Sequence, residues 1–378
     1  MKRILTILTL VATVLCGCQH NDKVPEPAKG LQKVSNAPGT TARKKQPIGH
    51  SLLPQAGGAP YELLVIMDNA QWERPVGRAL FEVLDTDLPG VAQSERQFRM
   101  SRIDPSSFRK MYKIFRNIIL LDVQDIYSTA KIKFSRDVYA RGQMIITLQA
   151  HDEQQLAEHL QKYGTQILDL FTKAEFNREF SFLAEKHNPE GNERAQRIFG
   201  CGVWVPVELN KYKEGKDFLW LSTNRGSKDM NIVIYTYPYT DPNTFTLDYF
   251  MQKRDSVMKA NIPGGPEGSY MTTQHEFVNV TDGTVKGEYA QIARGLWRVE
   301  GDHMGGPFVS HSRVDVANGR VVVIEGFVYA PESLKRNLIR TLEATLYTLT
   351  LPNEQNVENF SFGLDEVTIT TKQTVFII

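Results

Sequence analysis

The sequence predicts an α+β protein in two halves, with mostly antiparallel sheets and helices packed on one face of them. Apolar runs of strand length alternate with tight-turn signals, of which Asn318-Gly319 is the strongest, because hairpin turns need the positive φ that both residues adopt at low cost. Two longer segments, residues 152–174 and 331–346, repeat apolar residues every three or four positions, which indicates amphipathic helices. With 378 residues, 41% of them hydrophobic and 23% charged, the chain is long enough for two domains.

Residues 1–18 have the pattern of a lipoprotein signal peptide. The basic pair Lys2 and Arg3 precedes an apolar run over residues 4–15, which is too short to cross a bilayer as a helix. The run ends in the letters LCGC, which resemble a bacterial lipobox, with leucine at position −3 and glycine just before the acylated cysteine. We therefore predict that Cys18 is the lipidated N-terminus and the membrane anchor. The alternative is an ordinary signal peptide that is cleaved without acylation.

Residues 19–59 are predicted to form a flexible tether, since proline, glycine, lysine, asparagine and serine are scattered there without an apolar period. A flexible chain of this length has a root-mean-square span of about 35 Å. The basic cluster at residues 43–45 could touch anionic head groups, and the alternative is that these charges are solvated.

The N-terminal half is predicted over residues 60–190. A buried strand at 61–67 precedes a helix from Pro75 to Asp85, with proline in its first turn. Further strands follow near 97–103, 118–123 and 142–150. A long amphipathic helix then runs from Asp152 to Ala174, with a dent expected at Gly164. Its two histidines have no acidic partner at metal-binding spacing, so both are predicted to lie on the surface: His151 and His159.

The C-terminal half is predicted over residues 200–351, after a boundary near 190–200 where the segment 188–192 breaks the helical pattern. Strands are expected at 203–207, 217–222, 231–237, 270–280 and 285–300, with a helix over 242–260. A three-stranded meander over 295–330 and a final helix from Pro331 complete this half. The tail, residues 352–378, alternates apolar and polar positions, which favours an edge strand over a disordered end.

Motifs for cofactor or metal chemistry do not occur in the sequence. It has no phosphate-binding loop, nucleophile elbow, zinc-binding HExxH or calcium loop, so we expect no cofactor and no metal site. Residues 60–378 hold 36 basic and 41 acidic side chains, and this mildly acidic balance argues against nucleic acid as a partner. Once Cys18 is acylated, Cys201 is the thiol that remains, and it is predicted to be a buried small hydrophobe rather than a nucleophile.

The meander carries the candidate site. If Gly305-Gly306 is a two-residue turn, Glu300 faces His311 on the neighbouring strand. Strand alternation then places six charged residues on one face: Arg298, Glu300, Asp302, His311, Arg313 and Asp315. We predict a ligand-binding face for an anion; a hydrolase-like enzyme using Glu300 and His311 is one alternative, and a solvated face with balanced charges is the other. The apolar run 321–324 indicates that the sheet is covered on both sides or that this register slips by one.

Five strings in the C-terminal half resemble the Bacteroidota lipoprotein family defined by domain of unknown function 4837: FLWLS (218–222), YTYPY (235–239), IPGGPEGSYM (262–271), GLWRVEGDHMGGPFVS (295–310) and EGFVYAP (325–331). The resemblance runs from the lipobox to about Leu351. It implies an envelope lipoprotein, and it brings no activity, ligand or catalytic residue. The expected protein is thus a lipid-anchored envelope protein, expected on the outer membrane, which acts as a non-enzymatic binding or assembly module for an envelope protein or a glycan.

Overall fold

The computed structural model describes residues 53–352, 354, 360–363 and 369–370. Cys18, the signal peptide and most of the tether lie outside the described residues, so the predictions made for them stay predictions. None of the helices within the described ranges is both long and apolar enough to cross a membrane.

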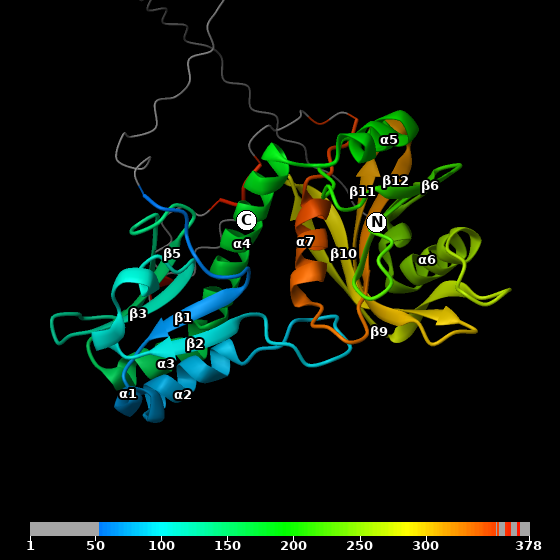
Figure 1. The fold of residues 1–378 in the computed structure, drawn as a ribbon. Coiled ribbons are helices and arrows are strands. Elements are labelled where there is room, and N and C mark those ends of the chain that lie inside the picture. The colour runs from blue at the N-terminus through cyan, green and yellow to red at the C-terminus, as the bar shows by residue number, and fades with distance from the viewer. Residues whose placement is uncertain (1–52, 353, 355–359, 364–368, 371–378) are drawn as a thin grey trace, which may run out of the picture. The chain divides into compact units, whose positions relative to one another are not determined.

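The N-terminal sheet has six strands in the order β13-β4-β5-β3-β1-β2 (Figure 1). Their bounds are β1 Glu62–Ile66, β2 Arg99–Ile103, β3 Asn117–Val123, β4 Lys131–Arg136, β5 Met144–Ala150 and β13 Ile369–Thr370. Strands β2, β1, β3 and β5, in this order across the sheet, pair in parallel, whereas β4 pairs antiparallel with β5 and β13 pairs antiparallel with β4. The centre of this sheet is therefore parallel, and its outer strands are antiparallel.

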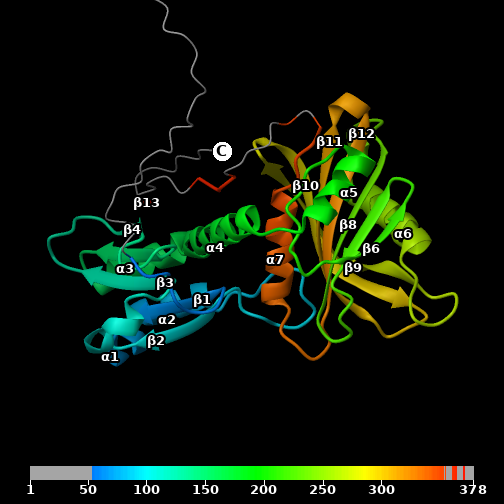
Figure 2. The ribbon, with the colours of Figure 1, turned by 45° about the horizontal axis from the view of Figure 1, so that its top comes forward.

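Helices cover one face of the N-terminal sheet (Figure 2). They are α1 Asn69–Glu73, α2 Pro75–Leu84, α3 Glu153–Tyr163 and α4 Thr165–Glu185. The apolar residues of α2, α3 and α4 form one core with alternate residues of the strands, such as Leu63 and Ile119. The other face of the sheet, with Leu64 and Ile118, packs instead against side chains from loops, among them Phe108.

The helix predicted from Asp152 to Ala174 is two helices, which meet at Gly164. Asp152 caps the first as predicted, and its carboxylate accepts a hydrogen bond from the Gln155 amide at 2.8 Å. Gly164 is needed because a Cβ there would lie well inside 3.0 Å of the Val83 side chain on α2. The predicted surface position of His159 is wrong: the ring is buried, because α2 packs against α3, and its centroid lies 4.8 Å from that of the tilted Tyr163 ring. His151 is exposed as predicted.

The C-terminal sheet has seven strands, all antiparallel, in the order β6-β7-β8-β12-β11-β10-β9. Their bounds are β6 Lys211–Gly215, β7 Phe218–Ser222, β8 Asp229–Pro238, β9 Tyr270–Val285, β10 Glu288–Glu300, β11 Gly305–Asp315 and β12 Arg320–Tyr329. The strand expected at 203–207 is irregular chain next to a single bridge between Gly202 and Thr350.

Helices cover the C-terminal sheet on both faces (Figure 2). Their bounds are α5 Pro189–Phe199, α6 Leu247–Asn261 and α7 Arg336–Tyr347. Residues of α5 and α7 share a core with Val322 and Ile324 of β12, whereas residues of α6 share a core with Val321 and Val323 of the same strand. Cover on both sides therefore explains the apolar run that the sequence shows at 321–324.

The predicted α+β class in two halves is confirmed, and over the two sheets together antiparallel pairs outnumber parallel ones. The prediction of helices on one face holds for the N-terminal sheet. It is too narrow for the C-terminal sheet, which buries both of its faces.

The described part of the tail contacts α4. Phe360 and Phe362 pack against Phe180, with ring centroids 4.9 and 5.5 Å away. The Asn177 side chain binds the main chain of Phe362 twice, donating to its carbonyl at 3.0 Å and accepting from its amide at 2.7 Å. Further along, β13 pairs with the edge strand β4, as an added edge strand would.

Candidate functional site

The meander turns at a different place from the one that the sequence predicts. β10 continues to Glu300, the chain turns over residues 301–304 with Gly301 at φ 85°, and β11 begins at Gly305. His311 consequently pairs with Ile292, eight positions along β10 from its predicted partner Glu300. The prediction that Glu300 faces His311 is therefore wrong.

The glycine pair at 305–306 does not form a turn, and it allows the main chain of the neighbouring strand β12 to come close to β11. A Cβ on Gly306 would lie well inside 3.0 Å of the Val328 carbonyl oxygen. The indole of Trp297 donates a hydrogen bond to that same oxygen at 3.2 Å, so ring, carbonyl and strand are crowded together. Glycine is thus required inside β11 for steric reasons, and a sequence pattern cannot distinguish this requirement from a hairpin turn.

Three of the predicted site residues lie at or next to the turn between β10 and β11. Arg298 and Glu300 are about half exposed and form an ion pair with each other, with Nη1 and Oε2 2.8 Å apart. Asp302 lies in the turn, where its carboxylate accepts a hydrogen bond from the His303 amide at 2.6 Å. Such an exposed pair contributes little to stability.

The other three predicted site residues are buried. Arg313 pairs with Glu354 and donates to the Leu349 carbonyl oxygen at 3.4 Å, and Asp315 pairs with Arg320 at 2.9 Å. Each charge of this group therefore has a partner within the fold. The register differs from the predicted one by eight residues, an even number, so the predicted residues of β10 and β11 still lie on one side of the sheet. The exposed group near the turn and the buried group are nevertheless not brought together.

His311 is fully buried and packs edge-on against Tyr347, with ring centroids 4.6 Å apart. Neither ring nitrogen has a hydrogen-bond partner among the described residues. Burial lowers the pKa of His311 to about 3, so the ring is neutral at physiological pH. A neutral ring without access to solvent is not suited to hold an anion or to exchange protons with a substrate.

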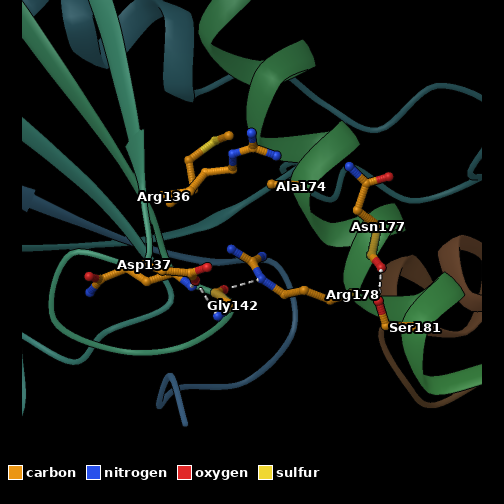
Figure 3. A pocket seen from close by; sticks show the side chains of 9 residues that line it. Arg136, Asp137, Gly142, Ala174, Asn177, Arg178 and Ser181 are labelled. Carbon is orange, nitrogen blue, oxygen red and sulfur yellow. Dashed lines mark hydrogen bonds between the residues drawn. The ribbon is translucent and has the colours of Figure 1, made fainter. Parts of the chain in front are cut away.

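A polar pocket lies instead where the loop between β4 and β5 meets α4 (Figure 3). Its volume is about 250 Å³. The lining residues are Arg136, Asp137, Gly142, Gln143, Met144, Ala174, Asn177, Arg178 and Ser181.

Hydrogen bonds fix the loop side of the pocket. The carboxylate of Asp137 accepts from the amides of Gly142 at 2.6 Å and Gln143 at 3.3 Å, which closes the loop on itself. The Gln143 side chain accepts from the Tyr139 amide at 2.9 Å and donates to the carbonyl oxygen of Lys113 at 2.6 Å. These hydrogen bonds hold the loop in its conformation.

Arg178 fixes the helix side of the pocket. Its Nε donates to the Gly142 carbonyl oxygen at 2.6 Å, and its Nη2 donates to the Asn117 side chain at 3.0 Å (Figure 3). Its Nη1 lies 2.9 Å from a carboxylate oxygen of Glu175, which is almost completely buried and also pairs with Arg116 at 2.7 Å. One arginine therefore ties α4 to both the loop and the sheet.

Arg136 differs from the other charged residues of the pocket. It is exposed, and it forms neither an ion pair nor a side-chain hydrogen bond with any described residue. Figure 3 shows its side chain extending from the end of β4 toward Ala174 on α4. The pocket thus contains one arginine without an ion pair among the described residues, Arg136, beside polar groups that are held by hydrogen bonds.

A carboxylate that titrates near neutral pH lies on the same helix. Burial, and then the neighbouring carboxylates of Glu175 and Glu208, raise the pKa of Glu179 to about 7. It does not line the pocket, which makes it a feature of the α4 surface rather than of the pocket chemistry.

A second polar cluster joins α6 to the C-terminal sheet. Arg254 and Glu325 form an ion pair at 2.7 Å whose side chains are both fully buried. Arg254 also donates to Thr273 at 2.8 Å, Thr273 donates to Asp255 at 2.6 Å, and Asp255 lies 2.6 Å from Nε2 of the exposed His275. Burial alone would raise the pKa of Asp255, but the hydrogen bonds from Thr273 and His275 outweigh it and lower that pKa. A chain of contacts therefore runs from the core to the surface.

Cys201 is buried, as the sequence predicts, and burial raises the pKa of its thiol to about 12. The thiol is thus protonated at neutral pH and behaves as a small hydrophobe. Within the described ranges, no group of three or more histidine, cysteine, aspartate or glutamate residues is placed to hold a metal ion.

The sequence did not indicate the pocket. Its residues come from two segments, 136–144 and 174–181, that are far apart in the chain and carry no motif. The local signals are a charged loop with Gly142 in the left-handed region and a helix with polar residues one turn apart, Asn177 and Ser181. Both patterns are common in ordinary surface loops and helices.

The fold and the pocket define a class of protein: two α+β halves, one with a mixed sheet and one with an antiparallel sheet, and a rigid polar pocket in the first. Residues 188–348 match the family model of a domain of unknown function, DUF4837, and residues 56–182 match that of another domain of unknown function, DUF8532. The predicted resemblance to the first family is confirmed for residues 188–348. Residues 56–182 match the second model, and the lipobox stays a prediction. A comparison with curated proteins found no match to the chain.

Proposed function

We propose that this protein is a lipid-anchored envelope protein of the Bacteroidota type, on the outer membrane, which acts as a non-enzymatic binding module. The pocket between the 136–143 loop and α4 is its binding site. One observation carries this proposal: the polar groups of the pocket are held by the fold, and Arg136 is left without an ion pair among the described residues.

Groups that are already held in place do not lose conformational freedom on binding, which favours affinity without movement. Their hydrogen bonds to main-chain groups also suit them to keep a shape rather than to exchange protons. Arg136 supplies a charge that can pair with a carboxylate or a phosphate through its planar fork. The expected ligand group is therefore an anion.

The pocket volume of about 250 Å³ is below the usual range of roughly 300–1,000 Å³ for sites that take drug-sized ligands. A side chain or one sugar ring is a suitable size. Asn177, on the pocket wall, already binds a peptide main chain through two hydrogen bonds with Phe362. That side chain is therefore already used within the chain, and the expected partner of Arg136 is an acidic segment of an envelope protein or an acidic glycan.

The pocket is tested by crosslinking in native membranes. A photoreactive residue at Ser181, in the pocket, should give a discrete crosslinked product, and the Arg136→Ala variant should lose most of it. Arg225→Ala is the matched control, because Arg225 is an exposed arginine of the C-terminal half without an ion pair among the described residues. Equal yields from Arg136→Ala and wild type would rule out the pocket as the binding site.

The anchor is tested by changing Cys18→Ser. The lipobox-like letters before this cysteine motivate the change. The variant should leave the membrane for the soluble fraction or keep its signal peptide. A variant that fractionates and migrates like the wild type would show that Cys18 is not the anchor.

A further inference from the structure

Three loop segments cover the second face of the N-terminal sheet, and we call them the loop layer: residues 53–58, 104–116 and 136–143. They hold one another through main-chain hydrogen bonds. The Ala56 amide donates to the Arg141 carbonyl oxygen at 2.9 Å, and the Gly57 amide donates to the Ile114 carbonyl oxygen at 2.8 Å. The loop layer is therefore one continuous surface.

Exposed basic and apolar side chains lie close together in sequence on that surface. Residues 109–112 form an exposed ridge of arginine, lysine, methionine and tyrosine, and Met111 is 70% exposed. Val138 and Arg141 are exposed on the neighbouring loop. The one acidic residue of that loop, Asp137, is half-buried and bound to main-chain amides.

The exposed arginines of this surface form no ion pair with any described residue. Most arginines in the described ranges form an ion pair within the fold, such as Arg116, Arg178 and Arg254. Arg109 and Arg141 form none with any described residue, and both side chains are exposed. Exposed apolar side chains beside unpaired cations are typical of surfaces that contact a membrane interface.

The described part of the chain begins at this surface, within the loop layer, where Gln55 bridges Arg141 and Gly57 bridges Phe115. If Cys18 carries the lipid, as proposed above, residues 19–52 separate the anchor from this surface. The loop layer is thus the part of the described chain that lies nearest in sequence to the proposed anchor.

We propose that the loop layer docks on anionic phospholipid head groups of the membrane in which the chain is anchored. Arg109, Lys110 and Arg141 contact the phosphates, while Met111 and Val138 enter the region between head groups and acyl chains. This docking rests on the proposed lipid anchor. It adds to the anchor a defined orientation, with the mixed sheet facing the bilayer.

The test uses the full lipidated chain, reconstituted into vesicles of phosphatidylcholine alone or mixed in equal parts with phosphatidylglycerol. An environment-sensitive fluorophore is attached at Met111→Cys, or at Val316→Cys as control, because Val316 is 82% exposed in the C-terminal half. Cys201 is buried and Cys18 is acylated, so neither competes for the label. The label at 111 should shift to the blue and become accessible to a bilayer-bound quencher in the mixed vesicles, and the label at 316 should not. A label at 111 that behaves like the label at 316 overturns the docking.

Charge reversal shows whether the loop layer itself is responsible. The triple variant Arg109→Glu, Lys110→Glu, Arg141→Glu should lose the blue shift, as should the wild type at high salt. A control with the same change in net charge, Lys211→Glu, Arg225→Glu, Lys228→Glu, reverses exposed residues of the C-terminal half and should keep it. Loss in both triple variants would show that net charge, rather than this surface, governs the signal, and would overturn the docking.

Sedimentation of the same samples separates the two proposals. A wild-type chain that stays in the supernatant with both kinds of vesicle overturns the anchor and the docking together. A chain that sediments with both kinds while its label at 111 stays in water overturns the docking and leaves the anchor standing.

Discussion

The two sheets of this protein differ in what covers them. Both faces of β12 in the C-terminal sheet pack against helices, with Val322 on the α7 side and Val323 on the α6 side. In β3 of the N-terminal sheet, Ile119 packs against helices, but Ile118 packs against loops. The loops that cover one face of the N-terminal sheet present exposed charges, such as Arg109 and Arg141, above a buried apolar layer.

Charged side chains in the two halves lie in different surroundings. Arg254 and Glu325 lie inside the C-terminal half with no exposed surface, and each satisfies the other. Arg136, at the edge of the loop-covered face, pairs with no described residue. Arg254 and Glu325 thus hold the fold, as Arg178 and Glu175 do in the N-terminal half, whereas Arg136 is exposed and unpaired among the described residues.

The largest effect is expected on the helix-covered face of the N-terminal sheet. Leu160 is 1% exposed in the core between α3 and the sheet, and Glu158 is exposed on the opposite side of α3. Truncating a buried leucine costs roughly 2–5 kcal/mol, and burying a carboxylate adds to that cost. Leu160→Asp should therefore lower the melting temperature far more than Glu158→Lys. Equal melting temperatures would contradict the packing of α3.

The next effect concerns the fully buried ion pair. Arg254→Met leaves Glu325 buried without its partner, which should lower the free energy of unfolding by about 3–5 kcal/mol in urea denaturation. Adding Glu325→Leu removes the unpaired charge and should restore most of that loss, because an apolar pair can replace a buried ion pair. A double variant that is less stable than Arg254→Met would show that Glu325 has another partner.

Neighbouring residues on β3 compare the two faces of one sheet. Ile119 and Ile118 are both fully buried, the first under helices and the second under loops. Ile119→Ala should cost about 4 kcal/mol, and Ile118→Ala should cost about 2 kcal/mol, because loops relax into a cavity more readily than helices do. Urea denaturation of both variants measures the difference, and a larger loss for Ile118→Ala would reverse the ranking of the two faces.

A smaller, pH-dependent effect is expected from His311. In the unfolded chain its imidazole gains a proton as the pH falls below about 6.5, whereas in the folded chain burial lowers its pKa to about 3. The unfolded state therefore binds more protons in this window, and the free energy of unfolding falls with decreasing pH by at most about 1.4 kcal/mol per pH unit. The contribution of the neutral His311 ring to the free energy of unfolding is fully present well above pH 6.5. His311→Phe should flatten the decline measured between pH 7 and pH 5, and an unchanged slope would exclude this histidine as its cause.

The smallest effect on stability is expected at the pocket cation. Arg136 is exposed and makes no ion pair with a described residue, so Arg136→Ala should change the free energy of unfolding by no more than about 0.5 kcal/mol. Arg178→Ala removes four contacts with Gly142, Arg116, Asn117 and Glu175 and should cost clearly more. Similar losses in thermal denaturation would mean that Arg136 has a structural role.

Local patterns in the sequence predicted the class of fold well. Asp152 is followed by a periodic apolar stripe, and this combination is sufficient to place the start of α3. How many residues of α3 are buried depends also on α2, which belongs to a distant part of the sequence. The burial of His159 therefore does not follow from the sequence of its own helix. The parallel centre of the first sheet likewise depends on pairing between distant segments such as β1 and β3.

The candidate site was harder to predict than the fold. Register along the meander depends on where the chain turns, and two glycines at 305–306 give the same signal for a turn as for a close approach to Val328. The true turn carries a single glycine, Gly301. The pocket could not be predicted at all, because contacts between residues 136–144 and 174–181 exist only after the sheet and α4 have packed.

Hydrogen–deuterium exchange of the lipidated full chain tests most directly whether the loop-covered face of the N-terminal sheet is the functional face. Exchange is compared on vesicles that contain phosphatidylglycerol and on vesicles of phosphatidylcholine alone. The loop layer, above all residues 104–116 and 136–143, should become protected on the anionic vesicles, while the edge strand β6 and the turn at 316–319 should exchange at the same rate on both. Protection at β6 or at that turn, with the loop layer unchanged, would contradict the account.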